Sequence, residues 1–135
     1  MSSYKVLVLG ANGMLGKMVG LYLDSVEELD VDITSRRKNE FVVKNFDSNY
    51  HIFDFNKQNR KPLEEIIKGR NYDYIVNCIG VIKPKIDEKN NNSISNTVLI
   101  NSYFPLDIHK LALKNGIKYF QIGTDCVFSG LDGHY

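Results

Sequence analysis

The sequence predicts an α/β fold, with one open sheet of about five parallel strands in the order 3-2-1-4-5 and helices on both faces. Two observations support this expectation. Short apolar runs alternate along the chain with segments whose apolar residues recur at helical spacing. The connections are long enough for helical crossovers, which are right-handed and join parallel strands. With 135 residues, 43% of them hydrophobic, residues 1–135 are expected to form one domain.

The individual elements follow from the local patterns. Apolar and β-branched residues form short runs or alternate in five segments, which predict strands at 5–9, 31–35, 51–55, 74–79 and 117–123. Apolar residues recur at helical spacing in three segments, which predict helices at 14–22, 62–68 and 97–114. The last helix is expected to bend near Pro105 and to end at Asn115–Gly116. Residues 36–49 and 83–96 are polar and irregular, and both are predicted to be loops.

Composition narrows the classes of partner. The 17 basic and 16 acidic residues nearly cancel, which predicts no binding to nucleic acid or to an anionic membrane. No apolar run approaches the roughly eighteen residues of a membrane span, and strand-like residues begin at Tyr4, so we expect a cytoplasmic protein. Cys78 and Cys126 lack metal-ligand spacing and are expected to be free thiols, with no metal site. The edge of the fifth predicted strand is exposed and can pair with another chain, so a homo-oligomer remains an alternative.

A glycine-rich turn joins the first predicted strand to the first predicted helix. Gly10 allows a sharp turn, Gly13 removes a side chain where backbone must approach a pyrophosphate, and Gly16 lets the helix lie close to the sheet. Free amide groups at the helix start would hold the phosphates. Three glycines can also simply make a tight turn, but the other elements follow in the order of a Rossmann-type dinucleotide-binding fold. The predicted phosphate site comprises Gly10, Asn12, Gly13, Met14, Leu15 and Gly16.

The ends of the second and third strands predict the cofactor. At the end of the second strand, an acidic residue binds the ribose of NAD, whereas an arginine accommodates the 2′-phosphate of NADP. Ser35 and Arg36 stand there, and a guanidinium can bind phosphate through two hydrogen bonds, so NADPH is favoured over NADH. Two alternatives remain: Arg36 belongs to a solvated basic turn, or Asp32 binds the ribose. Asp54 and Phe55 are expected to meet the adenine, although Asp54 can equally be a surface residue.

The second half of the chain carries more specific motifs. Asn77-Cys78-Ile79-Gly80 ends the fourth predicted strand, the segment 123–130 (GTDCVFSG) ends the fifth, and Asn101 and Pro105 lie in the helix between them. Together with the GxxGxxG turn, these motifs resemble those of the dTDP-4-dehydrorhamnose reductase family, extended short-chain dehydrogenases that reduce keto groups on nucleotide sugars. The resemblance covers essentially the whole chain.

The resemblance assigns roles to individual residues. It implies that Cys78, Ile79 and Gly80 line the cofactor crevice. It also implies that Asn101 helps to organise the active site through the bend of its helix. Thr124 corresponds to the family's catalytic serine or threonine, whose hydroxyl hydrogen-bonds the substrate carbonyl. A solvent-facing Asn101 and an ordinary strand-end Thr124 are the alternative interpretations.

The sequence departs from the family pattern at the proton donor. The family uses the tyrosine of a YxxxK pair, whose lysine lowers the tyrosine pKa. None of the eight tyrosines is followed by lysine four residues later. Members of the family are longer, so the chain is expected to stop before the sixth strand and the substrate domain and to be inactive alone.

Two functions follow from this pattern. The first is the NADP-binding portion of a reductase, or epimerase-reductase, acting on a 4-keto-6-deoxy nucleotide sugar such as dTDP-4-dehydrorhamnose. The alternative is a catalytically inactive dinucleotide-binding module with a regulatory or scaffolding role.

Overall fold

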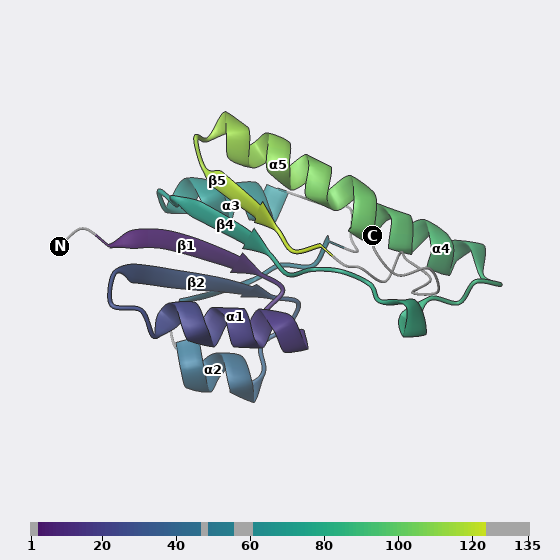
Figure 1. Cartoon of the computed structure of the whole chain (residues 1–135), viewed down its shortest axis with the longest axis horizontal. Helices are drawn as coiled ribbons and strands as arrows, with labels where there is room; N and C mark the ends of the chain where they lie inside the picture. The colour runs from purple at the N-terminus through teal and green to yellow at the C-terminus, as the bar shows by residue number, and fades with distance from the viewer. Residues whose placement is uncertain (1–2, 47–48, 56–60, 124–135) are drawn as a thin grey trace, which may run out of the picture.

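The sheet has the predicted order. The computed structural model describes residues 3–46, 49–55 and 61–123. Within this part of the chain, five parallel strands form one sheet in the order β3-β2-β1-β4-β5 (Figure 1). They are β1 (Tyr4–Leu9), β2 (Leu29–Ser35), β3 (Tyr50–Ile52), β4 (Tyr74–Asn77) and β5 (Lys118–Gln121). The predicted fold class and strand order are therefore confirmed.

The parallel register brings the functional loops to one edge of the sheet. Val8 of β1 pairs with Ile33 of β2 on one side and with Val76 of β4 on the other. Asn77, the last residue of β4, pairs with Gln121, the last residue of β5. The carboxyl ends of these strands consequently lie side by side, which is where open α/β sheets bind their ligands.

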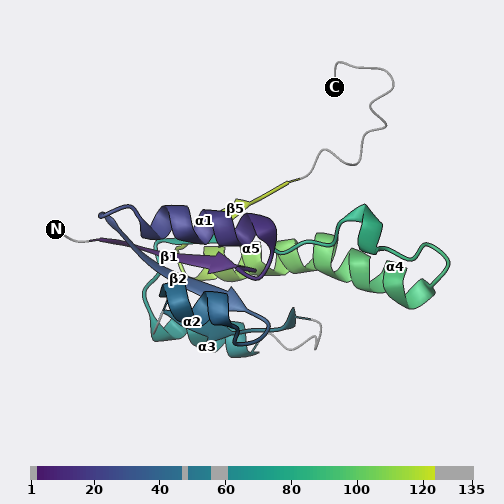
Figure 2. The ribbon, with the colours of Figure 1, turned by 90° about the horizontal axis from the view of Figure 1, so that it is seen from below.

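Helices cover both faces of the sheet, as predicted (Figure 2). On one face lie α1 (Met14–Asp24) and α2 (Glu40–Phe46), and on the other lie α3 (Lys61–Gly69) and α5 (Phe104–Lys114). None of the helices in the described ranges is both long and apolar enough to cross a membrane.

The helix before β5 is longer than predicted and changes its winding. It begins as α4 (Asn91–Val98), passes through the π-helical turn η3 (Leu99–Tyr103) and continues as α5. In Figures 1 and 2, α4 projects beyond the carboxyl edge of the sheet. Near Pro105, where a bend was expected, the structure has this π turn, which directly precedes the first turn of α5. The helix ends at Lys114, Asn115 caps it, and Gly116 follows with φ +69°.

Both segments predicted as loops contain helices. Residues 36–49 include α2, whose Val42 and Phe46 are buried four residues apart. Residues 83–96 include a 3-10 turn, η2 (Lys83–Lys85), and the start of α4. Asn90 caps α4 by accepting hydrogen bonds from the amides of Asn92 and Ser93. No residue of α4 is buried, so apolar spacing could not reveal it.

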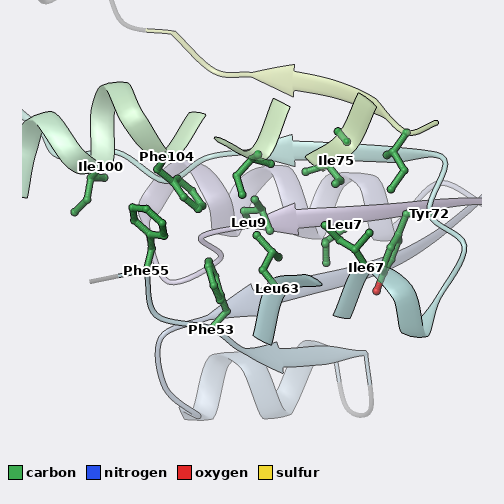
Figure 3. Packing of buried hydrophobic residues seen from close by; sticks show 13 residues of the cluster. Leu7, Leu9, Phe53, Phe55, Leu63, Ile67, Tyr72, Ile75, Ile100 and Phe104 are labelled. Carbon is green, nitrogen blue, oxygen red and sulfur yellow. The ribbon is translucent and has the colours of Figure 1, made fainter. Parts of the chain in front are cut away.

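The third strand is shorter than predicted, and the two phenylalanines beyond its end are buried in the core. Strand β3 ends at Ile52, and Phe53 and Phe55 lie beyond it. Both rings are buried and pack on Phe104 of α5, with ring centroids 6.0 Å and 4.2 Å away (Figure 3). The apolar positions 53 and 55 therefore reflect burial in the core beyond the end of β3.

Two glycines are the buried residues of helix α1. Gly16 and Gly20 are buried, whereas the side chains of Met14, Met18 and Tyr22 are 87%, 65% and 70% exposed. A Cβ atom at Gly20 would lie 3.1 Å from the ring of Phe46. The apolar periodicity thus predicted the helix correctly but marks its buried face only in part, at Val19, which packs on the core.

A cluster of charged residues joins the middle of β2 to the connection before β4. Asp32 is 1% exposed, and its carboxylate accepts hydrogen bonds from Arg70 and the Tyr72 hydroxyl and lies 2.8 Å from Nε2 of His51. Arg70 also pairs with Asp30. Burial by itself raises the pKa of Asp32. The hydrogen bonds of His51 and Tyr72 and the charge of Arg70 outweigh burial and lower that pKa below its ordinary value of 3.8.

Phe104 is expected to be central to the larger core. It is fully buried, so Phe104→Ala should lower the free energy of unfolding by about 3–5 kcal/mol through lost burial and a residual cavity. Urea denaturation measures this change. Met18→Ala, on the exposed side of α1, should change it by less than about 0.5 kcal/mol. Equal losses in the two variants would contradict the packing described here.

Stability should depend on acid pH through Asp32. Because its folded pKa lies below 3.8, its contribution is present above that value and is lost as pH falls through the folded pKa. Asp32→Asn should therefore flatten the pH dependence of the free energy of unfolding below about pH 4. Denaturation at several pH values measures the slope. The control is Glu27→Gln, on the exposed α1–β2 connection, and an unchanged slope in Asp32→Asn would count against the cluster.

Candidate functional site

The glycine turn is fixed by contacts between backbone segments. Gly10 has φ +89°, and a Cβ atom there would lie 2.7 Å from the Ile79 side chain and 3.2 Å from its backbone nitrogen. A Cβ atom at Gly16 would lie 2.2 Å from the carbonyl oxygen of Gly10. Only glycine fits at either position. Gly16 was predicted to let the helix approach the sheet, and its closest contact is with the turn itself.

Gly13 differs from the other two glycines. A Cβ atom at Gly13 would meet only the Gly10 carbonyl oxygen, at an ordinary 3.5 Å, and the residue is exposed. The packing of the protein therefore does not require glycine here. A side chain would instead occupy the space in front of the turn.

Unpaired donors lie beside Gly13. The amide of Gly13 bonds to the carbonyl of Gly10, and that of Lys17 bonds to the carbonyl of Gly13. Within the described part of the chain, no hydrogen bond uses the amides of Met14 or Leu15. These N–H groups stand at the positive end of the α1 dipole, which favours an anion.

Thr34 holds the turn against the end of β2. Its carbonyl accepts from the amide of Ala11 at 2.9 Å, and its hydroxyl accepts from the amide of Gly10 at 3.2 Å. Thr34 is buried, so these bonds are shielded from water. The glycine turn and the loop after β2 consequently occupy fixed positions next to each other.

A cavity of about 490 Å³ opens where three segments meet. It is lined by Asn12, Arg36, Arg37, Asn39 and Asp54. These residues come from the glycine turn, the loop after β2 and the segment after β3. Two guanidinium groups and one carboxylate give the lining a net positive charge, which suits a phosphate group.

The structure thus brings three of the predicted residues, Asn12, Arg36 and Asp54, to one cavity. The sequence analysis did not single out Arg37 or Asn39 as site residues. The signal for Asn39 was present. It is an asparagine just before a helix, where its Oδ1 accepts from the amide of Val42 at 2.9 Å.

Ser35 and Phe55 lie elsewhere than the sequence suggested. Ser35 is buried, and its hydroxyl donates to the carbonyl of Arg37 at 2.6 Å, so it shapes the loop rather than facing the cavity. The ring of Phe55 packs in the core on Phe104 instead of reaching towards an adenine. Both residues hold segments that lead to the cavity, without lining it themselves.

The alternative in which Asp32 binds a ribose does not fit the structure. Strand β2 continues to Ser35, so Asp32 lies within the strand rather than at its end. Its carboxylate is held by Arg70 and Tyr72 and is not part of the cavity lining.

The segment after β4 lies beside the glycine turn. Cys78 and Ile79 are the residues that a side chain at Gly10 would strike. Cys78 is a half-buried free thiol, and burial raises its pKa to about 11, which keeps it protonated and unreactive at neutral pH. Cys126 lies outside the described residues. Within those residues, no group of three or more His, Cys, Asp or Glu side chains could hold a metal ion.

Asn101 binds the same segment from the π turn. Its Oδ1 accepts from the amide of Val81, and its Nδ2 donates to the Val81 carbonyl, both at 2.8 Å. A Cβ atom at Gly80 would lie 3.7 Å from that Oδ1. The side chain is therefore engaged with the loop after β4 rather than turned to solvent alone. Single π turns in helices are frequent at functional sites.

Asn77 was not predicted as a site residue, yet it joins the ends of β4 and β5. It is fully buried, its Nδ2 donates to Oε1 of Gln121 at 2.9 Å, and its Oδ1 accepts from the amide of Ile79 at 3.0 Å. The amide of Ile122 binds its carbonyl. These bonds fix the strand end that leads to Thr124, which lies outside the described residues.

Comparisons with known proteins agree with the fold described above. A model of the NAD dependent epimerase/dehydratase family matches residues 6–134. The chain belongs to that family. The comparison with curated proteins gives no significant sequence match.

Solved structures of this family's fold resemble the chain at low sequence identity. ADP-L-glycero-D-manno-heptose-6-epimerase from Helicobacter pylori superposes with a TM-score of 0.76 at 14% identity, over 98% of this chain and 43% of that one. The dTDP-4-dehydrorhamnose reductase from Bacillus anthracis, solved with NADP, superposes with a TM-score of 0.69 at 20% identity, over 97% of this chain and 40% of that one. The UDP-glucose 4-epimerase from Bifidobacterium longum, solved with NAD+ and UDP, superposes with a TM-score of 0.72 at 16% identity, over 93% of this chain and 38% of that one. The chain spans less than half the length of each.

Two glycines of the turn, Gly16 and Gly13, should respond differently to alanine. Gly16→Ala should lower the free energy of unfolding by about 1–3 kcal/mol, because its Cβ meets fixed backbone. Gly13→Ala should leave stability nearly unchanged but weaken NADPH binding about tenfold or more, equivalent to about 1.4 kcal/mol. Thermal unfolding and fluorescence titration measure the two effects. A Gly13→Ala variant that binds NADPH normally would remove the pyrophosphate assignment.

Proposed function

We propose that this chain is the NADP-binding portion of a reductase, or an epimerase-reductase, that acts on a 4-keto-6-deoxy nucleotide sugar such as dTDP-4-dehydrorhamnose. One observation carries the nucleotide-binding part of the proposal. Two unpaired amides at the start of α1 directly follow the glycine turn, and Asn12 of that turn lines a cavity together with two arginines. Membership of the NAD-dependent epimerase/dehydratase family supports the class of reaction.

The residues at the carboxyl edge fit a dinucleotide. The amides of Met14 and Leu15 would bind the pyrophosphate, in the space that the missing side chain of Gly13 leaves open. Arg36 would bind the 2′-phosphate, and Asp54 would accept from the adenine amino group. When bound, the nicotinamide would supply a hydride to the substrate carbonyl.

The preference for NADP rests on this chain's own residues. The structural neighbours include one solved with NADP and one solved with NAD+, so they favour neither cofactor. In this chain, the acid that could accept from a ribose, Asp32, is held in the buried cluster. Arg36 and Arg37 line the cavity at the end of β2 instead. A dianionic phosphate is the ligand group that suits them.

The substrate end of the proposal depends on Thr124. In this proposal its hydroxyl donates a hydrogen bond to the substrate carbonyl. Asn101 keeps the loop after β4 in place through its two bonds to Val81. The sequence has no YxxxK pair, so this chain does not by itself provide the family's proton donor. We therefore assign turnover to a longer protein of which residues 1–135 are the nucleotide-binding part.

Cofactor titration tests the proposal directly. NADPH should bind this chain more tightly than NADH, and Arg36→Ala should reduce NADPH affinity by roughly tenfold while leaving NADH affinity within about twofold, because only NADPH carries the 2′-phosphate. Isothermal titration calorimetry measures both constants. Lys44→Ala, which removes an exposed positive charge in the last turn of α2, is the matched control.

The titration also separates the competing functions. Equal affinity for NADH and NADPH in the unaltered chain would refute the NADP assignment. Saturable NADPH binding by a protein that contains this chain and a YxxxK pair, without NADPH oxidation by any 4-keto-6-deoxy nucleotide sugar, would favour the binding-module alternative.

A further inference from the structure

Asn39 makes two different hydrogen bonds with its side chain. Its Oδ1 accepts from the amide of Val42 at 2.9 Å and so caps α2. Its Nδ2 donates to Oδ1 of Asn12 in the glycine turn. A single side chain thereby connects the beginning of α2 to the turn before α1.

The cap alone does not explain an asparagine at this position. Serine and aspartate cap helices about as well as asparagine, because each offers an oxygen to the free amides. Neither can donate to Asn12 as a carboxamide does, and aspartate would add a negative charge to a cavity suited to phosphate. The second bond is therefore the distinctive property of Asn39.

The arginines of the cavity lie on a loop that is held at both ends. Arg36 and Arg37 are exposed, and within the described residues neither side chain makes an ion pair or a hydrogen bond. Their placement is set by the backbone of the short loop between β2 and α2. The Ser35 hydroxyl holds that loop at the Arg37 carbonyl, and Asn39 holds its far end against Asn12.

We propose that Asn39 is a positioning residue for cofactor specificity: through its bond to Asn12 it holds Arg36 and Arg37 where they can bind the 2′-phosphate. The inference rests on the proposed NADP-binding function. A loop held in its binding conformation does not lose conformational freedom when the ligand arrives, so the effect appears as affinity. The effect is expected on the affinity for ligands that carry a 2′-phosphate, and not on the binding of the pyrophosphate that NADPH and NADH share.

The test is Asn39→Ser, whose hydroxyl still caps α2 but is too short to reach Asn12. The affinities for NADPH and for 2′,5′-ADP should fall on the order of tenfold. Affinities for NADH and for 5′-ADP should change by less than about twofold. Asn45→Ala is the matched control, because it removes an exposed asparagine of α2 whose side chain donates to the Phe41 carbonyl within the same helix.

A double-mutant cycle distinguishes positioning from folding. If Asn39 acts through the arginines, Asn39→Ser should cost nothing further in NADPH affinity once Arg36 and Arg37 are both alanine. An equal loss for NADPH and NADH, or an undiminished loss in that background, would overturn the inference. If the unaltered chain fails to discriminate NADPH from NADH, the proposed function fails. If it discriminates and Asn39→Ser keeps the same ratio, the inference alone fails.

Discussion

The backbone contact between Gly10 and Gly16 is the constraint on which the site depends. The carbonyl oxygen of Gly10 occupies the space that a side chain at Gly16 would need, so α1 begins directly against the turn. The first amides of α1 therefore follow β1 after a single tight turn. Thr34 then fixes the turn to β2 through two hydrogen bonds. The free donors and the arginine loop owe their proximity to these contacts.

The cavity is a product of parallel topology. Residues far apart in the sequence, Asn12, Arg36 and Asp54, reach it because β1, β2 and β3 all run in the same direction and their following segments leave at one edge. Behind the cavity, residues without access to it keep the segments in place. Ser35 holds the arginine loop, and Phe55 anchors the segment after β3 on Phe104.

The sequence predicted the sheet order and the glycine turn because apolar periodicity and positive φ have strong local signatures. It did not predict α2, which is only seven residues long, or the start of α4, which contains few apolar residues. The signals that begin these helices are single capping asparagines, Asn39 and Asn90. Phe55 was misplaced because alternation marks burial in a strand and in a buried loop equally. The bond between Asn39 and Asn12 depends on a contact across 27 positions, which no local pattern encodes.

Residues along strand β2 have two separate roles. Its middle carries Asp32, which binds Arg70 and Tyr72 on the side of α3 and β4, whereas its end carries Thr34 and the loop that faces the cavity. Exchanging the loop therefore leaves the charged cluster intact. A protein built in this way can acquire a different coenzyme by changes in a few surface positions, while the interactions that keep the strand in the sheet remain the same. Coenzyme specificity and the stability of the fold can then evolve independently.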